Sequence, residues 1–268
     1  MFSVLLSVYY KEKPEFLEKS LESIWYDQSV KPSEIVLVKD GPLTYELEAV
    51  IENYIKLLPL KIIALPENKG LGIALSEGLI HCTNDLVARM DGDDIAAPNR
   101  FLKQIQYFEQ NPEISLLSSN IAEFELTPAL IKSIRKVPQT HSAIFQFAKR
   151  RNPMNHMAVM FRKSDVLAAG NYQPFHGYED YYLWVRMFLT GSRAANSNEN
   201  LVFARIGNNM IARRQGLKFF NEELRLQKEF LNMGFINRME WCHNILLRAV
   251  PRLMPIFILK LIYKTLRK

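Results

Sequence analysis

The feature that most constrains the fold is an alternation of apolar strands and amphipathic helices from Ser3 to Asn111. Short apolar runs are separated by segments whose apolar residues recur at helical spacing. The predicted strands are Ser3–Val8, Glu34–Val38, Lys61–Leu65 and Leu86–Met90, and the predicted helices are Pro14–Gln28, Tyr45–Leu58, Gly70–His81 and Asn99–Asn111. This series predicts a parallel sheet covered by helices on both faces. Ligands of such sheets bind beyond the carboxyl ends of the strands, so functional residues are expected there.

After about residue 112 the elements become shorter and more mixed. The predicted strands are Ile114–Ser119, Ile121–Leu126 and Ala158–Phe161, and the predicted helices are Thr140–Arg150 and Asp180–Leu189. Such a half usually completes the sheet and forms a second wall of the site. From about Gly216 the pattern is helical. No low-complexity linker separates these parts, which favours one domain followed by a C-terminal extension.

The charge of the chain is concentrated at its end. The net charge is 34 − 28 = +6, and residues 241–268 alone contain six Lys or Arg and no acidic residue. Residues 1–240 are therefore neutral overall, whereas a nucleic-acid-binding domain would spread its cations over a folded face. Basic and apolar residues intermixed in one segment favour a helix lying on an anionic membrane surface. The alternative is a helix packed on the body of the protein with its cations in water.

Few other features of the sequence indicate a compartment. Arg252, Lys260 and two prolines interrupt the apolar tail well short of the ~20 residues that a membrane-spanning helix needs. No basic residue precedes the apolar segment Phe2–Tyr10, so no signal peptide is expected. Two cysteines are too few for a disulfide framework, which favours a reducing compartment.

The strongest functional motif is Asp91-Gly92-Asp93-Asp94, directly after a predicted strand. Three carboxylates in four residues repel one another unless a cation lies between them. Oxygen ligands of this kind suit Mg²⁺ or Mn²⁺ bound together with a substrate diphosphate. The alternative is an acidic solvated turn in which Asp94 caps the next helix.

Two further segments follow strands at the same predicted edge. Asp40 ends the second strand, where a carboxylate could accept hydrogen bonds from a base or a ribose, or only from its own turn. Asn68-Lys69-Gly70 opens a helix, where backbone can approach an anionic ligand closely. A third glycine and Gly-Lys-Ser/Thr are both missing, so this is neither a dinucleotide-binding fingerprint nor a P-loop.

A second acidic pair, Glu179-Asp180, lies at the start of a predicted helix. One of these carboxylates could act as a general base for an acceptor hydroxyl, or both could only complement the helix dipole. His156 and His176 are isolated and lack the spacing of a zinc site.

These motifs, in this order, resemble family 2 glycosyltransferases. Residues 3–215 carry the resemblance. The stretches Lys39–Thr44, Gly70–Leu75 and Arg89–Ile95 are similar to the amylovoran and O-antigen branch of bacterial transferases. Two residues depart from the pattern: Lys39 stands where many relatives have a first Asp, and Ser76 where this branch often has Asn.

The resemblance implies an α/β GT-A fold, a Rossmann-like mixed sheet flanked by helices, with a helical C-terminal extension. Residues 1–215 would form the transferase domain, with residues 1–100 as its nucleotide-sugar half and residues 101–215 as its acceptor half. Residues 216–268 would form a basic, apolar tail that associates with the membrane.

The resemblance also implies roles for individual residues. Asp93 and Asp91 would bind Mn²⁺ or Mg²⁺, and Asp180 with Glu179 would provide the catalytic base. The residues implied in nucleotide-sugar binding are Tyr9, Asp40, Asn68, Gly70, Arg89, Asp91 and Arg213.

The implied activity is inverting transfer of a hexose, galactose or glucose, from a UDP-sugar to a polyprenyl-diphosphate-linked acceptor. The implied acceptor is N-acetylglucosamine-diphospho-undecaprenol, in O-antigen or related surface polysaccharide biosynthesis. The enzyme would be a peripheral protein on an anionic membrane surface, the cytoplasmic face of the bacterial inner membrane, with no nucleic-acid partner. Two alternatives stay open: a sugar nucleotidyltransferase, and a non-catalytic membrane scaffold that binds nucleotide sugar or polysaccharide.

Overall fold

The computed structural model describes residues 1–207 and 216–253. These residues form two compact units. Unit 1 comprises residues 1–147 and 152–205, and unit 2 comprises residues 148–151 and the described residues after Arg205. The tail segment 254–268, on which part of the membrane prediction rests, lies outside the described residues.

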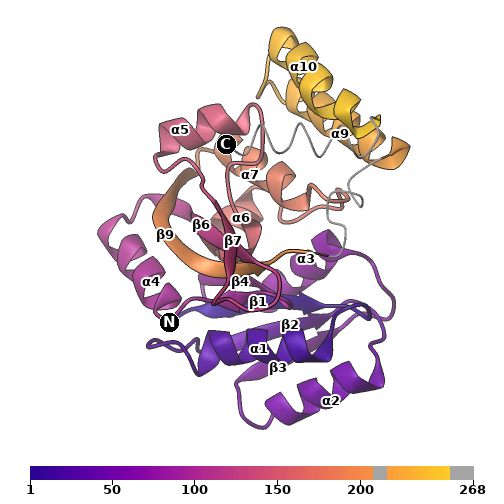
Figure 1. Cartoon of the computed structure of the whole chain (residues 1–268). Coiled ribbons are helices and arrows are strands. Elements are labelled where there is room, and N and C mark those ends of the chain that lie inside the picture. The colour runs from indigo at the N-terminus through magenta and orange to yellow at the C-terminus, as the bar shows by residue number, and fades with distance from the viewer. Residues whose placement is uncertain (208–215, 254–268) are drawn as a thin grey trace. The chain divides into compact units, whose positions relative to one another are not determined.

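Unit 1 is built on one mixed β-sheet with helices on its faces (Figure 1). The strands are β1 (Ser3–Val8), β2 (Glu34–Lys39), β3 (Leu60–Ala64), β4 (Leu86–Asp91), β5 (Ile95–Ala96), β6 (Ile114–Phe124), β7 (Ile131–Arg135), β8 (Met160–Arg162) and β9 (Arg193–Arg205). The helices are α1 (Pro14–Trp25), α2 (Tyr45–Tyr54), α3 (Leu71–His81), α4 (Arg100–Gln110), α5 (His141–Ala148), α6 (Lys163–Ala168) and α7 (Glu179–Leu189).

The sheet order is β3-β2-β1-β4-β8-β6-β9-β5, and β7 pairs with β6 off this path. The first four strands are parallel, so the predicted parallel sheet is confirmed, with helix and strand ends within a few residues of the prediction. Beyond β4 the sheet becomes mixed, because β8 is antiparallel to both β4 and β6. The α/β mixed sheet implied by the resemblance is therefore the observed fold.

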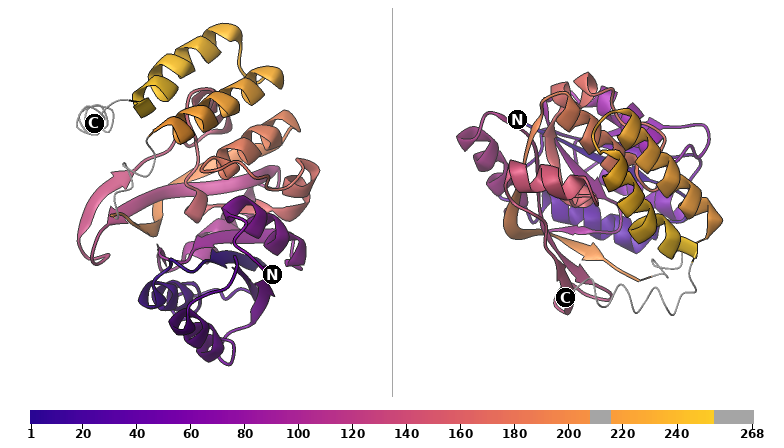
Figure 2. Two further views of the ribbon diagram at one scale, coloured as in Figure 1. Left: turned by 90° about the vertical axis from the view of Figure 1, so that its right-hand side faces the viewer. Right: turned by 90° about the horizontal axis from the view of Figure 1, so that it is seen from above.

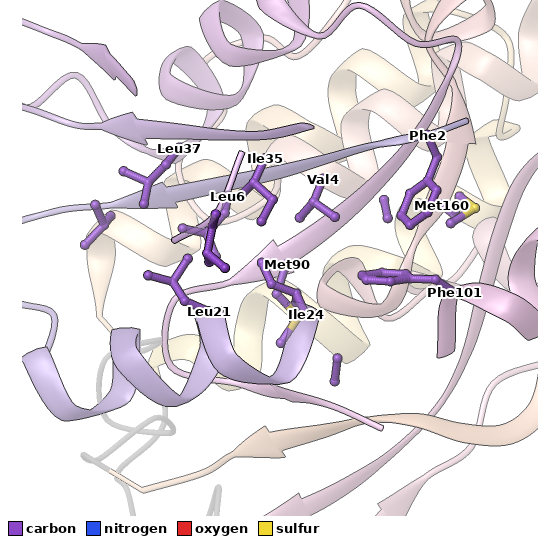
Figure 3. Close-up of a cluster of buried hydrophobic side chains, with 14 of the residues drawn as sticks. Phe2, Val4, Leu6, Leu21, Ile24, Ile35, Leu37, Met90, Phe101 and Met160 are labelled. Atoms are coloured by element: carbon purple, nitrogen blue, oxygen red, sulfur yellow. The ribbon is translucent and has the colours of Figure 1, made fainter. Parts of the chain in front are cut away.

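Side chains alternate between two hydrophobic layers around β1 and β2. Figure 3 shows Val4, Leu6 and Ile35 facing Leu21 and Ile24 of α1, all fully buried. The opposite face packs against α3, which lies on the other side of the sheet from α1 and α2 (Figure 1). Gly78 allows this close packing, since a Cβ there would lie 2.5 Å from side-chain atoms of Leu5 and Val38.

Several predictions for the second half were wrong. The strands expected at Ile114–Ser119 and Ile121–Leu126 are one buried strand, β6. Asn120 does not interrupt it, because its amide donates to the Asn198 carbonyl at 2.9 Å and accepts from the Val137 N–H at 3.0 Å. The strand expected at Ala158–Phe161 is a short 3-10 helix, His156–Ala158, followed by β8.

Four elements were not predicted at all: β5, β7, α6 and β9. The longest of these, β9, has a polar centre from Asn196 to Asn200 that gives no strand signal. It forms because β6 pairs with it in parallel over most of its length, with irregular register beside Asn120. The long curved pair β6–β9 is visible in Figure 2.

Unit 2 contains α9 (Leu217–Asn232) and α10 (Arg238–Asn244), continued by a π-helical turn (Ile245–Ala249) and a 3-10 turn (Val250–Leu253). Its interior holds a polar cluster. Fully buried Glu223 pairs with Arg248 at 2.6 Å and with Arg252 at 3.5 Å, and Asn244 donates to Gln227 at 2.8 Å. Two of the six cations of residues 241–268, Arg248 and Arg252, thus stabilise the packing of unit 2. No described helix is both long and apolar enough to cross a bilayer.

Candidate active site

The carboxyl ends of β1, β2 and β4 lie side by side, because these strands are parallel and in register. They bring the segments after Val8, Lys39 and Met90 to one edge of the sheet, as the sequence predicted. Open α/β sheets bind their ligands outside the carboxyl ends of the strands, so a ligand is expected at this edge.

The acidic turn after β4 offers oxygen ligands at one point. One carboxylate oxygen each of Asp91, Asp93 and Asp94 lies within 4.8 Å of the others. Burial raises the pKa of Asp93 to about 7, and the negative charges of Asp91 and Glu12 add to the rise. A divalent cation would relieve this repulsion, and an all-carboxylate ligand set fits Mg²⁺ or Mn²⁺.

Glu12, beyond the end of β1, belongs to this acidic cluster but was not predicted. Its pKa is raised by burial and by the charge of Asp91, although a hydrogen bond from the Lys13 N–H opposes the rise. The only available signal was its position after a strand in the same parallel sheet. Which strands lie adjacent is a property of the topology and not of the local sequence.

Asp94 does not cap a helix, contrary to the alternative considered for it. Its side chain is buried and accepts a hydrogen bond from the Arg205 N–H at 2.7 Å. The Arg205 guanidinium stacks between Phe16 and Phe124, 3.8 and 4.6 Å from the ring centroids, and its Nε donates to the Asp93 carbonyl at 3.1 Å. Arg205, the last residue of β9, thus fixes the conformation of the acidic turn, and its role was also missed.

Arg89 lies on β4 and is fully buried. It forms an ion pair with Asp91. Its Nε and Nη1 have no hydrogen-bond partner within the described residues. Its charge also favours the ionised forms of Glu179 and Asp180, so the acidic turn and the second acidic pair both lie near this one cation. Its ion pair fits a role in positioning Asp91, and its contact with a nucleotide sugar stays a prediction.

The Asp40 carboxylate ties two loops together. It accepts hydrogen bonds from the Lys69 N–H at 2.7 Å and the Gly70 N–H at 3.0 Å, and its own carbonyl accepts from the Asn68 amide at 3.1 Å. Gly41 has a φ of +86°, and a Cβ there would lie 2.6 Å from the Asn68 nitrogen, so only glycine allows this approach. Asp40, Asn68 and Gly70, the three residues predicted to bind the nucleotide sugar in these loops, therefore lie together.

Two other residues of interest lie at the ends of neighbouring strands, Lys39 at the end of β2 and Tyr9 just after β1. The departure at Lys39 has a structural account, because its ammonium pairs with Glu48 at 2.7 Å. Tyr9, beyond β1, is partly exposed. Arg213 lies outside the described residues.

The second acidic pair begins α7. Asp180 accepts hydrogen bonds from the Asn152 amide at 2.6 Å and from the Tyr181 N–H at 2.7 Å. Burial raises the pKa of Asp180, while these hydrogen bonds and the charges of Arg135 and Arg89 oppose the rise. Glu179 is buried, and its Oε2 has no hydrogen-bond partner in the part of the chain that the structure describes.

His156 lies beside these groups as a neutral side chain. It shares a hydrogen bond with the Tyr172 hydroxyl at 3.0 Å, and burial and then the charge of Arg89 keep its pKa well below the usual value.

Among residues 1–207 and 216–253, the only group of three or more side chains placed to bind a metal is Asp91, Asp93 and Asp94.

Replacing Glu179 by glutamine is expected to stabilise the protein at pH 8 and not at pH 5. Burial raises the pKa of Glu179 from 4.5 to about 7, so folding favours its protonated form. The protonated Glu179 side chain makes its whole contribution to the free energy of unfolding below pH 4.5, and this contribution is lost as the pH rises through about 7. The shift corresponds to about 3 kcal/mol of unfolding free energy.

Urea unfolding of the wild type and of Glu179→Gln at both pH values tests this expectation. Glu52→Gln, at an exposed position on α2, is the matched control, and its stability relative to the wild type should be the same at both pH values. An equal difference between wild type and Glu179→Gln at pH 5 and pH 8 would contradict the assignment.

Comparison with known proteins agrees with this geometry. Residues 3–167 match the model of the family described as glycosyl transferase family 2. The chain is 42% identical over its whole length to the amylovoran biosynthesis glycosyltransferase AmsE of Erwinia amylovora, all of which is covered. It is 38% identical to an Escherichia coli UDP-Gal:alpha-D-GlcNAc-diphosphoundecaprenol beta-1,3-galactosyltransferase, over 98% of this chain and 95% of that protein.

Two solved structures share the fold at low sequence identity. Residues 1–349 of S. aureus TarS in complex with UDP-GlcNAc match with a TM-score of 0.66 and 19% identity, covering 94% of this chain and 72% of that one. The mannosyltransferase PcManGT of Pyrobaculum calidifontis, in complex with GDP-Man and Mn²⁺, matches with a TM-score of 0.62 and 16% identity, covering 92% and 68%.

Proposed function

Because this chain belongs to glycosyl transferase family 2, we propose that it is an inverting, metal-dependent transferase that moves a hexose from a UDP-sugar to a lipid-linked acceptor. The observation that carries this proposal is the pair of acidic groups around Arg89: one suits a metal and a diphosphate, and the other suits a general base. A nucleotide-sugar transferase that works by one direct displacement needs a base for the acceptor hydroxyl and a group that neutralises charge on the departing diphosphate.

The substrates follow from the relatives. The E. coli relative is named for transfer from UDP-Gal to GlcNAc-diphosphoundecaprenol, and AmsE for amylovoran biosynthesis. We therefore propose galactose or glucose as the sugar, N-acetylglucosamine-diphospho-undecaprenol as the acceptor and a surface polysaccharide such as O-antigen as the product.

On the donor side, the chain's own residues bind and orient the nucleotide sugar. Asp93 and Asp91 would hold Mn²⁺ or Mg²⁺, a Lewis acid that neutralises charge on the departing UDP. Arg89 orients Asp91 through their ion pair, and Arg205 fixes the turn through Asp93 and Asp94. Tyr9, together with the loops joined by Asp40, would bind the nucleotide.

On the acceptor side, Asp180 would take the proton from the attacking hydroxyl. The Asn152 amide and the Tyr181 N–H hold its carboxylate in place, and burial raises its pKa toward the range in which a base is effective. Attack from the face opposite the departing UDP then inverts the anomeric carbon without a covalent intermediate.

The location that fits this acceptor is the membrane surface. We propose that the cations of segment 254–268, Lys260, Lys264, Arg267 and Lys268, bind anionic lipid on the cytoplasmic face of the inner membrane, each contributing ~1 kcal/mol. Substituting all four by glutamate in the full chain should abolish flotation with anionic vesicles. Unchanged flotation would mean that the tail packs on the protein instead.

The experiment that tests the function is transfer from a panel of UDP-sugars to N-acetylglucosamine-diphospholipid, with Mn²⁺ and with a chelator. One donor giving product only with metal is the expected result. Metal-dependent UDP binding without transfer to any acceptor would favour the non-catalytic scaffold. A product with a sugar 1-phosphate and UTP would favour the nucleotidyltransferase.

A further inference from the structure

The β6–β7 hairpin carries an exposed apolar surface in unit 1 to which none of the roles above is assigned. Leu126 and Leu130 at its tip are 84% and 62% exposed, and Ile131 and Ile134 on β7 are 42% and 48% exposed. The hairpin extends away from the rest of unit 1 in both views of Figure 2. Four large apolar side chains in one short segment are more than the single exposed residues that are normal on a protein surface.

The backbone of the hairpin groups these side chains. Phe124 pairs with Ile131 and Glu123 with Ser133, so one extra residue is inserted in β7 at this point. The insertion breaks the alternation of faces and brings Ile131 and Ile134, three positions apart, to the same face. Ser133 donates to the Glu123 carboxylate on the other face.

The same segment is basic. Residues 125–136 contain Lys132, Arg135 and Lys136 against one acid, Glu125, giving a net charge of +2. The ion pair of Lys132 with Glu125 spans 3.7 Å between exposed groups, so it binds weakly and leaves Lys132 accessible. Apolar and cationic side chains together match an amphiphile with an anionic head.

The base of the hairpin reaches the proposed catalytic base. Arg135 pairs with Ile121 at the end of β7 nearest the body of the sheet. Its carbonyl accepts from the Asn155 amide at 3.4 Å, and three residues earlier Asn152 donates to Asp180. The positive charge of Arg135 also acts on Asp180. From Arg135 to the tip, four or more strand residues span about 13 Å or more.

We propose that the β6–β7 hairpin binds the lipid diphosphate of the acceptor, with Arg135 and Lys136 contacting the diphosphate and the exposed apolar residues contacting the lipid chain. The order along the hairpin, from Asp180 through Arg135 to the apolar tip, is the order of sugar hydroxyl, diphosphate and lipid in such a molecule. This inference rests on the proposed function and names the part of the protein that recognises its acceptor.

The test compares two acceptors with the full chain. One is N-acetylglucosamine diphosphate on a long polyprenyl chain, and the other carries a short, water-soluble alkyl chain. Ile131→Ser/Ile134→Ser should raise the KM for the long-chain acceptor about tenfold and leave the short-chain KM unchanged, because only lipid contacts are lost. Arg135→Ala should raise both KM values about 10- to 100-fold, because a charge-assisted contact to the diphosphate is lost.

The matched control is Ile55→Ser/Leu57→Ser, two apolar residues that are 47% and 60% exposed after α2, at the opposite edge of the sheet. It should change neither KM. Binding of UDP with Mn²⁺ should be the same in all variants, which shows that the fold and the donor site are intact.

Other outcomes overturn the inference in distinguishable ways. If the wild type transfers sugar and the hairpin variants match it, the hairpin does not bind the acceptor. If the variants lose as much affinity for anionic vesicles that contain no acceptor as they lose for the long-chain acceptor, the surface recognises the bilayer and not the diphosphate lipid. If the wild type uses neither acceptor, the proposed function itself fails, and this inference fails with it.

Discussion

Replacing Asp180 by asparagine is expected to lower kcat for sugar transfer about a thousandfold, which lies within the range that a general base contributes. The amide cannot take the proton of the attacking hydroxyl. Binding of the UDP-sugar should be unchanged, because Asp180 lies on α7 and not in the metal-binding turn. The measurement is kcat and donor KM by product formation, with UDP binding determined in parallel.

A structural defect would give a different pattern. Asn152 and the Tyr181 N–H donate to different oxygens of Asp180, so asparagine keeps one of these hydrogen bonds and loses the other. Asp165→Asn, in the first turn of α6, is the matched control and should retain wild-type kcat. If Asp180→Asn keeps more than a tenth of the wild-type kcat, Asp180 is not the base, and buried Glu179 becomes the candidate.

The second large effect concerns the metal. Chelation, or Asp93→Asn, is expected to lower kcat/KM a hundredfold or more, because the charge on the departing diphosphate is then not neutralised. Asp85→Asn, at the opposite end of β4, is the matched control and should retain its activity.

Thermal unfolding provides a readout that does not depend on catalysis. Mn²⁺ at a hundredfold excess over its Kd should stabilise the wild type by about 2.7 kcal/mol, and Asp93→Asn much less. Without metal the order should reverse at pH 8, because burial beside Asp91 and Glu12 raises the pKa of Asp93 to about 7 and its ionised form destabilises the fold. An equal Mn²⁺ shift in both proteins would place the metal elsewhere.

The sequence by itself determined the first half of the fold. Strand and helix patterns between Ser3 and Asn111 are local, because each depends on spacing within about a dozen residues. The parallel order of β1, β2, β3 and β4 then placed Asp40 and the acidic turn at one edge. The acidic pair at Glu179 was also found from sequence, since adjacent acids at a helix start form a local pattern.

Only the tertiary structure decided the rest, because the interactions concerned join distant residues. The strand β9 has a polar centre and becomes a strand by pairing with distant strands, chiefly with β6, about 80 residues earlier. Glu12 and Arg205 meet the acidic turn from β1 and β9, and neither carries a motif. The pKa values of Asp93 and Glu179 depend on burial and neighbouring charge, which sequence spacing does not contain. Local periodicity therefore set the framework, and long-range strand pairing with burial of charge set the site.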